Sequence, residues 1–89
     1  MKIYTLAFCD IDYYGFGTKT ITTFTNKENA ISKMKEEYLE KCKKLGIENP
    51  MVEDSSENQI TDDYAYILMA YYWDIFETEI EINLDNSKI

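Results

Sequence analysis

One long amphipathic segment, residues 25–46, limits the folds open to this chain. Thr25 and Glu28 have the spacing of a capping box, in which each side chain binds the other residue's backbone N–H group where a helix begins. Gly46 can adopt the left-handed conformation that ends many helices, and Pro50 prevents the helix from resuming. Between these ends, apolar side chains recur at helical spacing, which predicts one buried stripe: Ala30, Ile31, Met34, Tyr38, Cys42 and Leu45.

The residues before this helix predict a hairpin. Residues 2–9 alternate as a strand does, and both of its faces are apolar, which is typical of a central strand. Residues 19–24 are rich in β-branched side chains and predict a second strand. Residues 10–18 contain Gly15 and Gly17, so we expect them to form the turn between two antiparallel strands.

The residues after the helix are less uniform. Residues 47–60 predict a loop, because their central part is acidic and lacks apolar side chains. Residues 61–72 fit either a short helix, with Thr61 as its cap, or a strand with two apolar faces. The spacing of their apolar residues favours the helix, and the strand stays open as the alternative. From Phe76 to Leu84, apolar and acidic residues alternate, which predicts a half-buried strand.

These elements predict a single α+β domain over residues 1–89. Its antiparallel sheet has about three strands, the long helix packs on one face, and a short second helix is possible at residues 61–72. The following side chains are expected to form the core: Leu6, Phe8, Ile21, Phe24, Ile31, Met34, Tyr38, Ile80 and Ile82.

The charge balance indicates which partners the chain can bind. It carries 17 acidic and 9 basic residues, a formal net charge of −8. Nucleic acids and anionic membranes would repel such a chain, so we expect direct binding to neither. A protein with a basic surface would attract it. The alternative is that the acidic residues serve only solubility.

The sequence excludes most catalytic sites. It contains no histidine, and its two cysteines are too few for an all-cysteine zinc site. It contains no phosphate-binding or dinucleotide-binding glycine motif. Asp10, Asp12 and Gly15 match part of a calcium-binding loop, but Ile21 stands where the bidentate glutamate is required. We therefore predict no enzymatic activity, no cofactor and no metal site.

The residues also bear on the cellular compartment. Only Lys2 and a short apolar run precede Asp10, which does not fit a signal peptide. No apolar run approaches the roughly 20 residues needed to span a bilayer. Cys9 and Cys42 fit small buried side chains in a reducing compartment. We expect a cytoplasmic protein.

Two kinds of side chain are candidates for binding a partner. The aromatic residues Tyr13 and Tyr14 lie in the predicted turn, where they either contact a partner or fold back under the sheet. Acidic residues gather in the later part of the chain, where they either form a binding surface or are simply solvated. The acidic candidates are Glu53, Asp54, Glu57, Asp62, Asp63, Glu77, Glu79 and Glu81.

Two segments resemble small acidic proteins of phages and mobile elements. They are FTNKENA, residues 24–30, which leads into the helix, and YWDIFE, residues 72–77, before the last strand. Some proteins of this kind are anti-CRISPR or other anti-defence inhibitors, which block a nucleic-acid-binding machine. The resemblance therefore implies a protein partner that is a CRISPR-associated or other defence nuclease.

The expected function is that of a non-enzymatic acidic protein that occupies a basic site on a nucleic-acid-binding partner and inhibits it. A toxin-neutralising immunity protein is one alternative. A structural or self-associating accessory protein, possible as a homodimer, is another.

Overall fold

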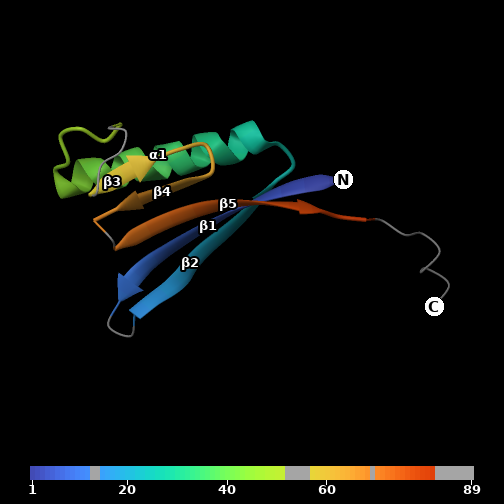
Figure 1. Ribbon diagram of the computed structural model, residues 1–89, viewed down its shortest axis with the longest axis horizontal. Coiled ribbons are helices and arrows are strands. Elements are labelled where there is room, and N and C mark those ends of the chain that lie inside the picture. Colours follow the sequence, from blue (N-terminus) through green and yellow to red (C-terminus); the bar gives the residue numbers. More distant parts are fainter. Residues whose placement is uncertain (13–14, 52–56, 69, 82–89) are drawn as a thin grey trace.

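The computed structural model describes residues 1–12, 15–51, 57–68 and 70–81. Five antiparallel strands form one sheet in the order β2-β1-β5-β4-β3, and helix α1 packs on one of its faces (Figure 1). The α+β class is confirmed, whereas the expected sheet of about three strands is wrong, because the sheet has five. The elements are β1 (Lys2–Asp12), β2 (Gly15–Phe24), α1 (Lys27–Leu45), β3 (Asn58–Ile60), β4 (Tyr64–Ile67) and β5 (Tyr71–Glu79).

The short helix predicted at residues 61–72 is wrong, because this segment contains β4 and the start of β5. Ala65 and Ile67 are buried in the core, while Tyr64 and Tyr66, which alternate with them, point to the other face of the sheet. β4 has apolar or aromatic side chains on both faces and therefore no polar alternation, so the helical spacing arose by coincidence. A turn that includes Leu68, with φ of 51°, joins the two strands. β3 lies inside the predicted loop 47–60.

The predicted turn over residues 10–18 is also wrong. β1 continues to Asp12 and β2 begins at Gly15, and the two strands stay paired to that end. Ile11 pairs with Phe16, so most of the expected turn is strand. The central place of β1 is confirmed, since it pairs with β2 on one side and β5 on the other.

The last strand begins earlier than predicted and faces the opposite way. β5 starts at Tyr71, and its Trp73 side chain is 1% exposed in the core. Because alternate residues share a face, Phe76 points away from the helix and is 54% exposed. The alternation read from Phe76 onward therefore assigned the wrong face to the core. Residues 82–84 of the predicted strand lie outside the described residues.

The N-cap of helix α1 lies one residue after the predicted cap. Asn26, not Thr25, is the N-cap, and its Oδ1 atom accepts a hydrogen bond from the backbone N–H of Asn29 at 3.2 Å. Gly46 ends the helix in the left-handed conformation, as predicted, with φ of 72°. The stripe is confirmed at four positions and misses Leu45, which is exposed, and Ile31, which is half-buried. The buried positions are Ala30, Met34, Tyr38 and Cys42.

Tyr38 links the helix to the sheet and to the chain after the helix. Its ring meets Trp73 edge-on, with centroids 5.9 Å apart. Its hydroxyl donates a hydrogen bond to the carbonyl of Pro50 and accepts one from the Asn58 amide at 2.9 Å. Burial raises the pKa of Tyr38 to about 12. Ile21, expected in the core, is instead 65% exposed. The core cluster comprises Leu6, Met34, Tyr38, Cys42, Ala65, Ile67 and Trp73.

The position of the cap gives the first prediction. Asn26→Ala should lower the free energy of unfolding by about 1 kcal/mol, because it removes the acceptor for the Asn29 N–H group. Thr25→Ala is the matched control and should change it by less than about 0.5 kcal/mol. Urea denaturation measures both. Equal losses, or a larger loss for Thr25→Ala, would contradict this assignment of the cap.

The hydroxyl of Tyr38 gives the second prediction. An unfolded tyrosine ionises near pH 10, whereas folded Tyr38 stays protonated to about 12. The stabilisation from this group is therefore complete below about pH 10 and is lost as the pH rises to about 12. Tyr38→Phe should flatten the fall in stability over that window. It should also cost about 1–3 kcal/mol at pH 7, because buried polar partners of the hydroxyl lose a hydrogen bond.

The measurement is denaturant unfolding of both proteins at pH 7, 9, 10 and 11. Tyr64→Phe controls for loss of an exposed tyrosine hydroxyl and should leave the pH profile close to that of the wild type. Parallel pH profiles for wild type and Tyr38→Phe would show that folding does not raise the pKa of the Tyr38 hydroxyl.

Candidate partner-binding surface

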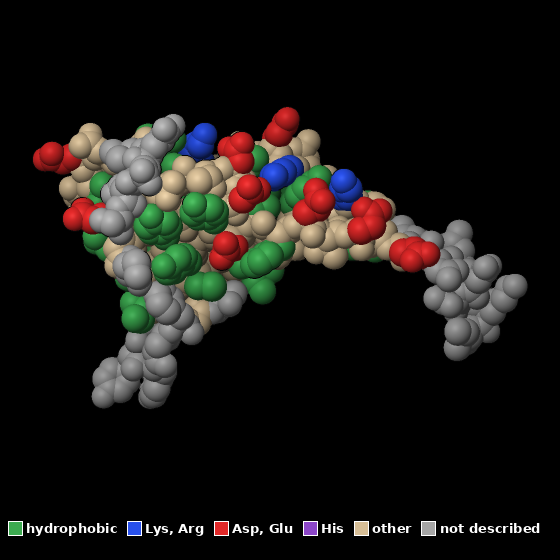
Figure 2. Space-filling model, in the orientation of Figure 1, with side chains coloured by type: hydrophobic (Ala, Val, Ile, Leu, Met, Phe, Trp, Pro, Cys, Tyr) green, Lys and Arg blue, Asp and Glu red, His purple; other side chains and the backbone are tan. Residues whose placement is uncertain are grey.

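The sheet face opposite α1 carries aromatic side chains. On this open face, Tyr72 pairs with Tyr66, and Asp74 lies opposite Tyr64 on one side and Ala7 on the other. Figure 2 shows green side chains gathered over the strands, with an acidic side chain among them. We define the open face by Ile21, Tyr64, Tyr66, Tyr72, Asp74 and Phe76.

The tyrosines of the open face contact one another. The rings of Tyr64 and Tyr66 stack with centroids 6.4 Å apart and planes 5° apart. Tyr66 and Tyr72 lie 6.0 Å apart and tilted, and the Tyr66 hydroxyl donates a hydrogen bond to Gln59 at 3.2 Å. These contacts restrict ring rotation before any partner arrives, which reduces the entropy lost on binding. No described residue forms an ion pair with half-buried Asp74.

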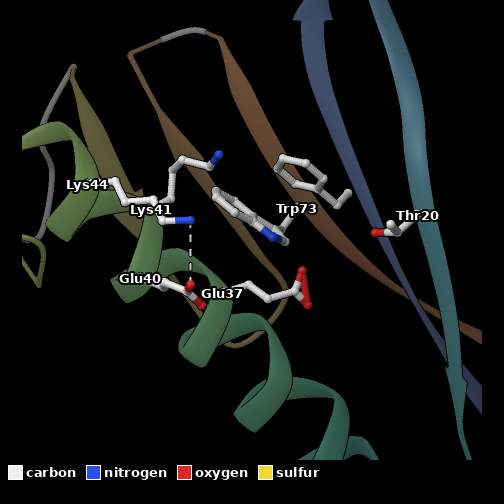
Figure 3. Close-up of a pocket in the computed structure, with 7 residues that line it drawn as sticks. Thr20, Glu37, Glu40, Lys41, Lys44 and Trp73 are labelled. Carbon is white, nitrogen blue, oxygen red and sulfur yellow. Dashed lines mark ion pairs between the residues drawn. The ribbon is translucent and has the colours of Figure 1, made fainter.

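A groove of about 250 Å³ lies on the other face, between α1 and strands β1 and β2 (Figure 3). Phe8 and Trp73, with ring centroids 4.8 Å apart, form its aromatic wall. Thr20 lies on the β2 side. The helix contributes Glu37, Glu40, Lys41 and Lys44.

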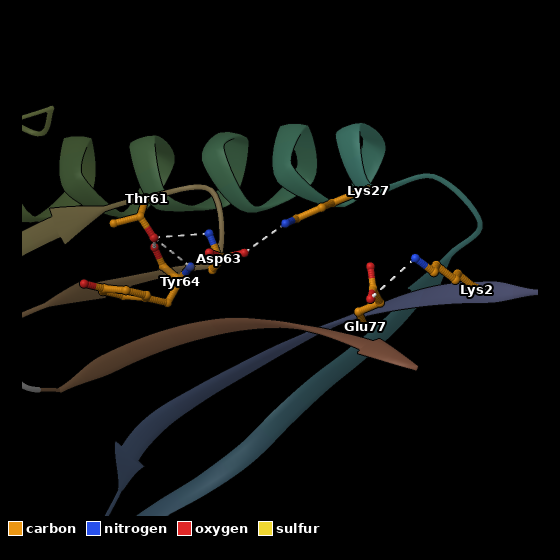
Figure 4. Close-up of polar contacts among 6 residues, drawn as sticks. All are labelled: Lys2, Lys27, Thr61, Asp63, Tyr64 and Glu77. Carbon is orange, nitrogen blue, oxygen red and sulfur yellow. Dashed lines mark hydrogen bonds and ion pairs between the residues drawn. The ribbon is translucent and has the colours of Figure 1, made fainter. Parts of the chain in front are cut away.

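The predicted acidic residues near the start of α1 are paired within the chain. Asp63 contacts Lys27 at 3.0 Å, and Glu77 contacts Lys2 at 3.9 Å (Figure 4). Glu79 contacts the N-terminal amine at 3.1 Å. The hydrogen bond that Lys27 donates to the Asp63 carboxylate raises the pKa of Lys27. Three of the eight predicted acidic residues therefore contact a cation of the chain.

Asp63 is held in place by a turn that the sequence also marks. The Thr61 hydroxyl accepts hydrogen bonds from the backbone N–H groups of Asp63 and Tyr64, each at 3.1 Å (Figure 4). The sequence predicted Thr61 as a helix cap. Its hydroxyl does accept hydrogen bonds from backbone N–H groups two and three residues later, but these bonds close a tight turn before β4.

The remaining candidates do not gather into one site. Glu57, Asp62 and Glu81 are exposed and lie on different segments. Tyr13, Tyr14, Glu53 and Asp54 lie outside the described residues. Sequence reasoning missed the open face, because it assigned Tyr64 and Tyr66 to a helix and predicted that the strand face starting at Phe76 was the buried one. Residues 64–67 and 72–76 have apolar or aromatic side chains on both faces, so no alternation in the sequence marks this surface.

The described residues also bear on other kinds of site. Among them, no group of three or more histidine, cysteine, aspartate or glutamate side chains is arranged to hold a metal ion. α1 is not long and apolar enough to cross a membrane. Neither Cys9 nor Cys42 forms a disulfide bond, and burial raises the pKa of Cys42.

Comparisons of the chain with models of protein families, with curated proteins and with solved structures find no match.

The exposure of Phe76 gives a prediction about stability. Phe76→Thr keeps a strand-forming residue and should change the free energy of unfolding by less than about 0.5 kcal/mol, because the ring contributes little to the core. Ile67→Ala, on a neighbouring strand but facing the helix, should cost about 2–5 kcal/mol. Urea denaturation compares them. A comparable loss for Phe76→Thr would assign that ring to the core and remove it from the open face.

Proposed function

We propose that this chain is a non-enzymatic binding protein whose open face docks on a basic surface of a partner protein. The supporting observation is the open face itself, where Tyr66 packs on both Tyr64 and Tyr72 and an exposed phenylalanine lies beside Asp74. Aromatic side chains dominate the energetic centres of protein interfaces, because they bury much area at a small cost in side-chain entropy.

Asp74 favours an arginine or lysine on the partner. A guanidinium group can stack on a tyrosine ring while its N–H groups bind a carboxylate in pairs. Asp74 lies opposite Tyr64, so both kinds of contact are available to one cation. A carboxylate enclosed by an apolar partner surface would instead lose its solvation without compensation.

The acidic residues are proposed to act at longer range. Asp63, Glu77 and Glu79 each contact a cation of the chain, so they are poor anchors for a partner. The net charge of −8 nevertheless attracts a basic protein and accelerates its association. The proposed contact site is therefore the open face and not the acidic residues.

Inhibition follows if the occupied surface normally binds nucleic acid. A nuclease presents lysine and arginine side chains to the phosphate backbone, and an acidic protein seated on them would block access. The resemblance to anti-defence proteins and the absence of histidine support an inhibitor without catalytic activity. A CRISPR-associated or other defence nuclease is the partner that we propose.

The test compares charge reversals at two places on β5. Asp74→Lys should weaken binding to purified CRISPR-associated nucleases by about 100-fold or more, because it removes a contact and adds a repulsive charge. Glu79→Lys is the matched control, since it makes the same change in net charge away from the open face. It should mainly slow association. Surface plasmon resonance at two salt concentrations separates the two effects, and displacement of labelled nucleic acid measures inhibition.

If neither Asp74→Lys nor Tyr66→Ser weakens binding, the open face is not the docking surface. Equal weakening by Asp74→Lys and Glu79→Lys would show that binding depends on the net charge of the chain and not on a contact at Asp74. Binding without displacement of nucleic acid would contradict inhibition while keeping the docking surface.

A further inference from the structure

β2 is one edge of the sheet, so one side of its backbone faces away from the other strands (Figure 1). It has ten residues, whereas the opposite edge strand, β3, has three. A β-bulge at Lys19 interrupts the pairing with β1 and protects one end of β2. Residues 20–24, which we call the β2 edge, pair regularly with β1 and contain no proline and no charged side chain to protect them.

The hydrogen bonds of β1 show which groups of the β2 edge point outward. In an antiparallel sheet, successive residues of a central strand bond to opposite neighbours. Ile11 of β1 donates its N–H to the segment just before β5 at 2.9 Å, so the odd-numbered residues of β1 bond to β5 and the even-numbered ones to β2. Thr22 lies opposite Leu6 and therefore bonds to β1. The backbone groups of Ile21 and Thr23 point outward, and no described residue bonds to them.

These outward groups are complementary to those of a second copy of the chain. A copy laid antiparallel along the β2 edge, with a two-fold axis at Thr22, places each Ile21 opposite the other copy's Thr23. Both residues of each such pair point outward, so each pair exchanges two backbone hydrogen bonds. Isoleucine and threonine are β-branched side chains that pack well as cross-strand neighbours. Residues 19–23 are all exposed, so this edge is accessible.

The charge around the β2 edge favours a second copy over a basic partner. Residues 20–24 and residues 4–8, which pair with them, carry no charge. The charged side chains of α1 in the groove beside Thr20 are two glutamates and two lysines, whose charges cancel. The backbone of β5, which carries acidic side chains, lies two strands inward, about 10 Å away, beyond the screening length of about 8 Å at physiological salt. The edge therefore neither attracts a basic protein nor strongly repels a second copy.

We propose that two copies of this chain pair antiparallel through the β2 edge and form one continuous sheet. The two-fold axis is perpendicular to the sheet, so both helices lie on one side and both open faces lie on the other. The dimer presents two docking surfaces to the same side. It uses the edge of the sheet and not the open face, so it neither requires nor excludes the proposed function.

Sedimentation equilibrium tests this pairing with the protein alone. The wild type should pass from monomer to dimer as its concentration rises toward millimolar. Thr23→Pro should weaken dimerisation by about 100-fold, because it removes one outward N–H group from each copy and each lost hydrogen bond is worth about tenfold. Proline is tolerated on an edge strand where the N–H group faces solvent. Thr23→Val is the matched control, since it keeps the N–H group and a β-branched side chain, and it should dimerise like the wild type.

Two measurements on the wild type keep the test valid if Thr23→Pro fails to fold. Hydrogen exchange at high protein concentration should show new protection at the amides of Ile21 and Thr23, whereas the Thr22 amide is bonded to β1 and is protected at every concentration. Dimerisation should strengthen with added salt, because salt screens the repulsion between two chains of net charge −8. Tyr66→Ser changes the open face and should leave dimerisation unchanged.

The proposal is wrong if the wild type stays monomeric up to millimolar concentration, or if Thr23→Pro and Thr23→Val dimerise equally. It is also wrong if Ile21 and Thr23 gain no protection at high concentration, or if added salt weakens the dimer. Loss of the dimer in Tyr66→Ser would assign the contact to the open face instead. Failure of the dimer leaves the docking of a basic partner standing, since Asp74→Lys tests that separately.

Discussion

The contacts of Tyr38 hold the two layers of this fold together. One side chain meets Trp73 of the central sheet, the Pro50 carbonyl after the helix and the Asn58 amide at the start of β3. Asn58 is itself 6% exposed and also donates to the Asn49 carbonyl at 3.3 Å. The edge strand β3 has only three residues, too few to fix its position by sheet hydrogen bonds alone. Its place beside β4 therefore depends on this buried polar network.

A single helix cannot cover the sheet that it packs against. Five strands at the usual spacing span about 19 Å, whereas a helix with its side chains is about 10–12 Å wide. One face is therefore partly covered and the other is not covered by α1 at all (Figure 1). The groove beside α1 and the open face are both consequences of this mismatch. The candidate docking surface thus arises from the architecture rather than from an added loop.

Local patterns predicted the elements that have one apolar face and clear ends. The stripe of α1 and the Gly46 stop are confirmed, because a helix with one buried face leaves a regular spacing in the sequence. The cap was misplaced by one residue, since Thr25 and Asn26 are both good capping residues and only geometry distinguishes them.

The same reasoning failed where strands are apolar on both faces. Tyr64 and Tyr66 are aromatic and Ala65 and Ile67 are aliphatic, so no charged or strongly polar side chain alternates with the buried ones to identify the strand or its inward face. For β5, the exposed Phe76 and the buried Trp73 lie three residues apart and occupy opposite faces. A prediction that takes Phe76 as inward-facing therefore exchanges the buried and the exposed face of β5. The open face was missed for that reason, since a surface made of aromatic residues looks like core in the sequence.

The acidic balance and the aromatic open face constrain each other. Exposed aromatic side chains on a sheet promote association between copies of a chain. With a net charge of −8, two copies repel, and the repulsion is strongest at the short separations that open-face contact requires. A partner of opposite charge experiences attraction at the same separations. The charge therefore supports the proposal that the open face binds a basic partner rather than a second copy of the chain.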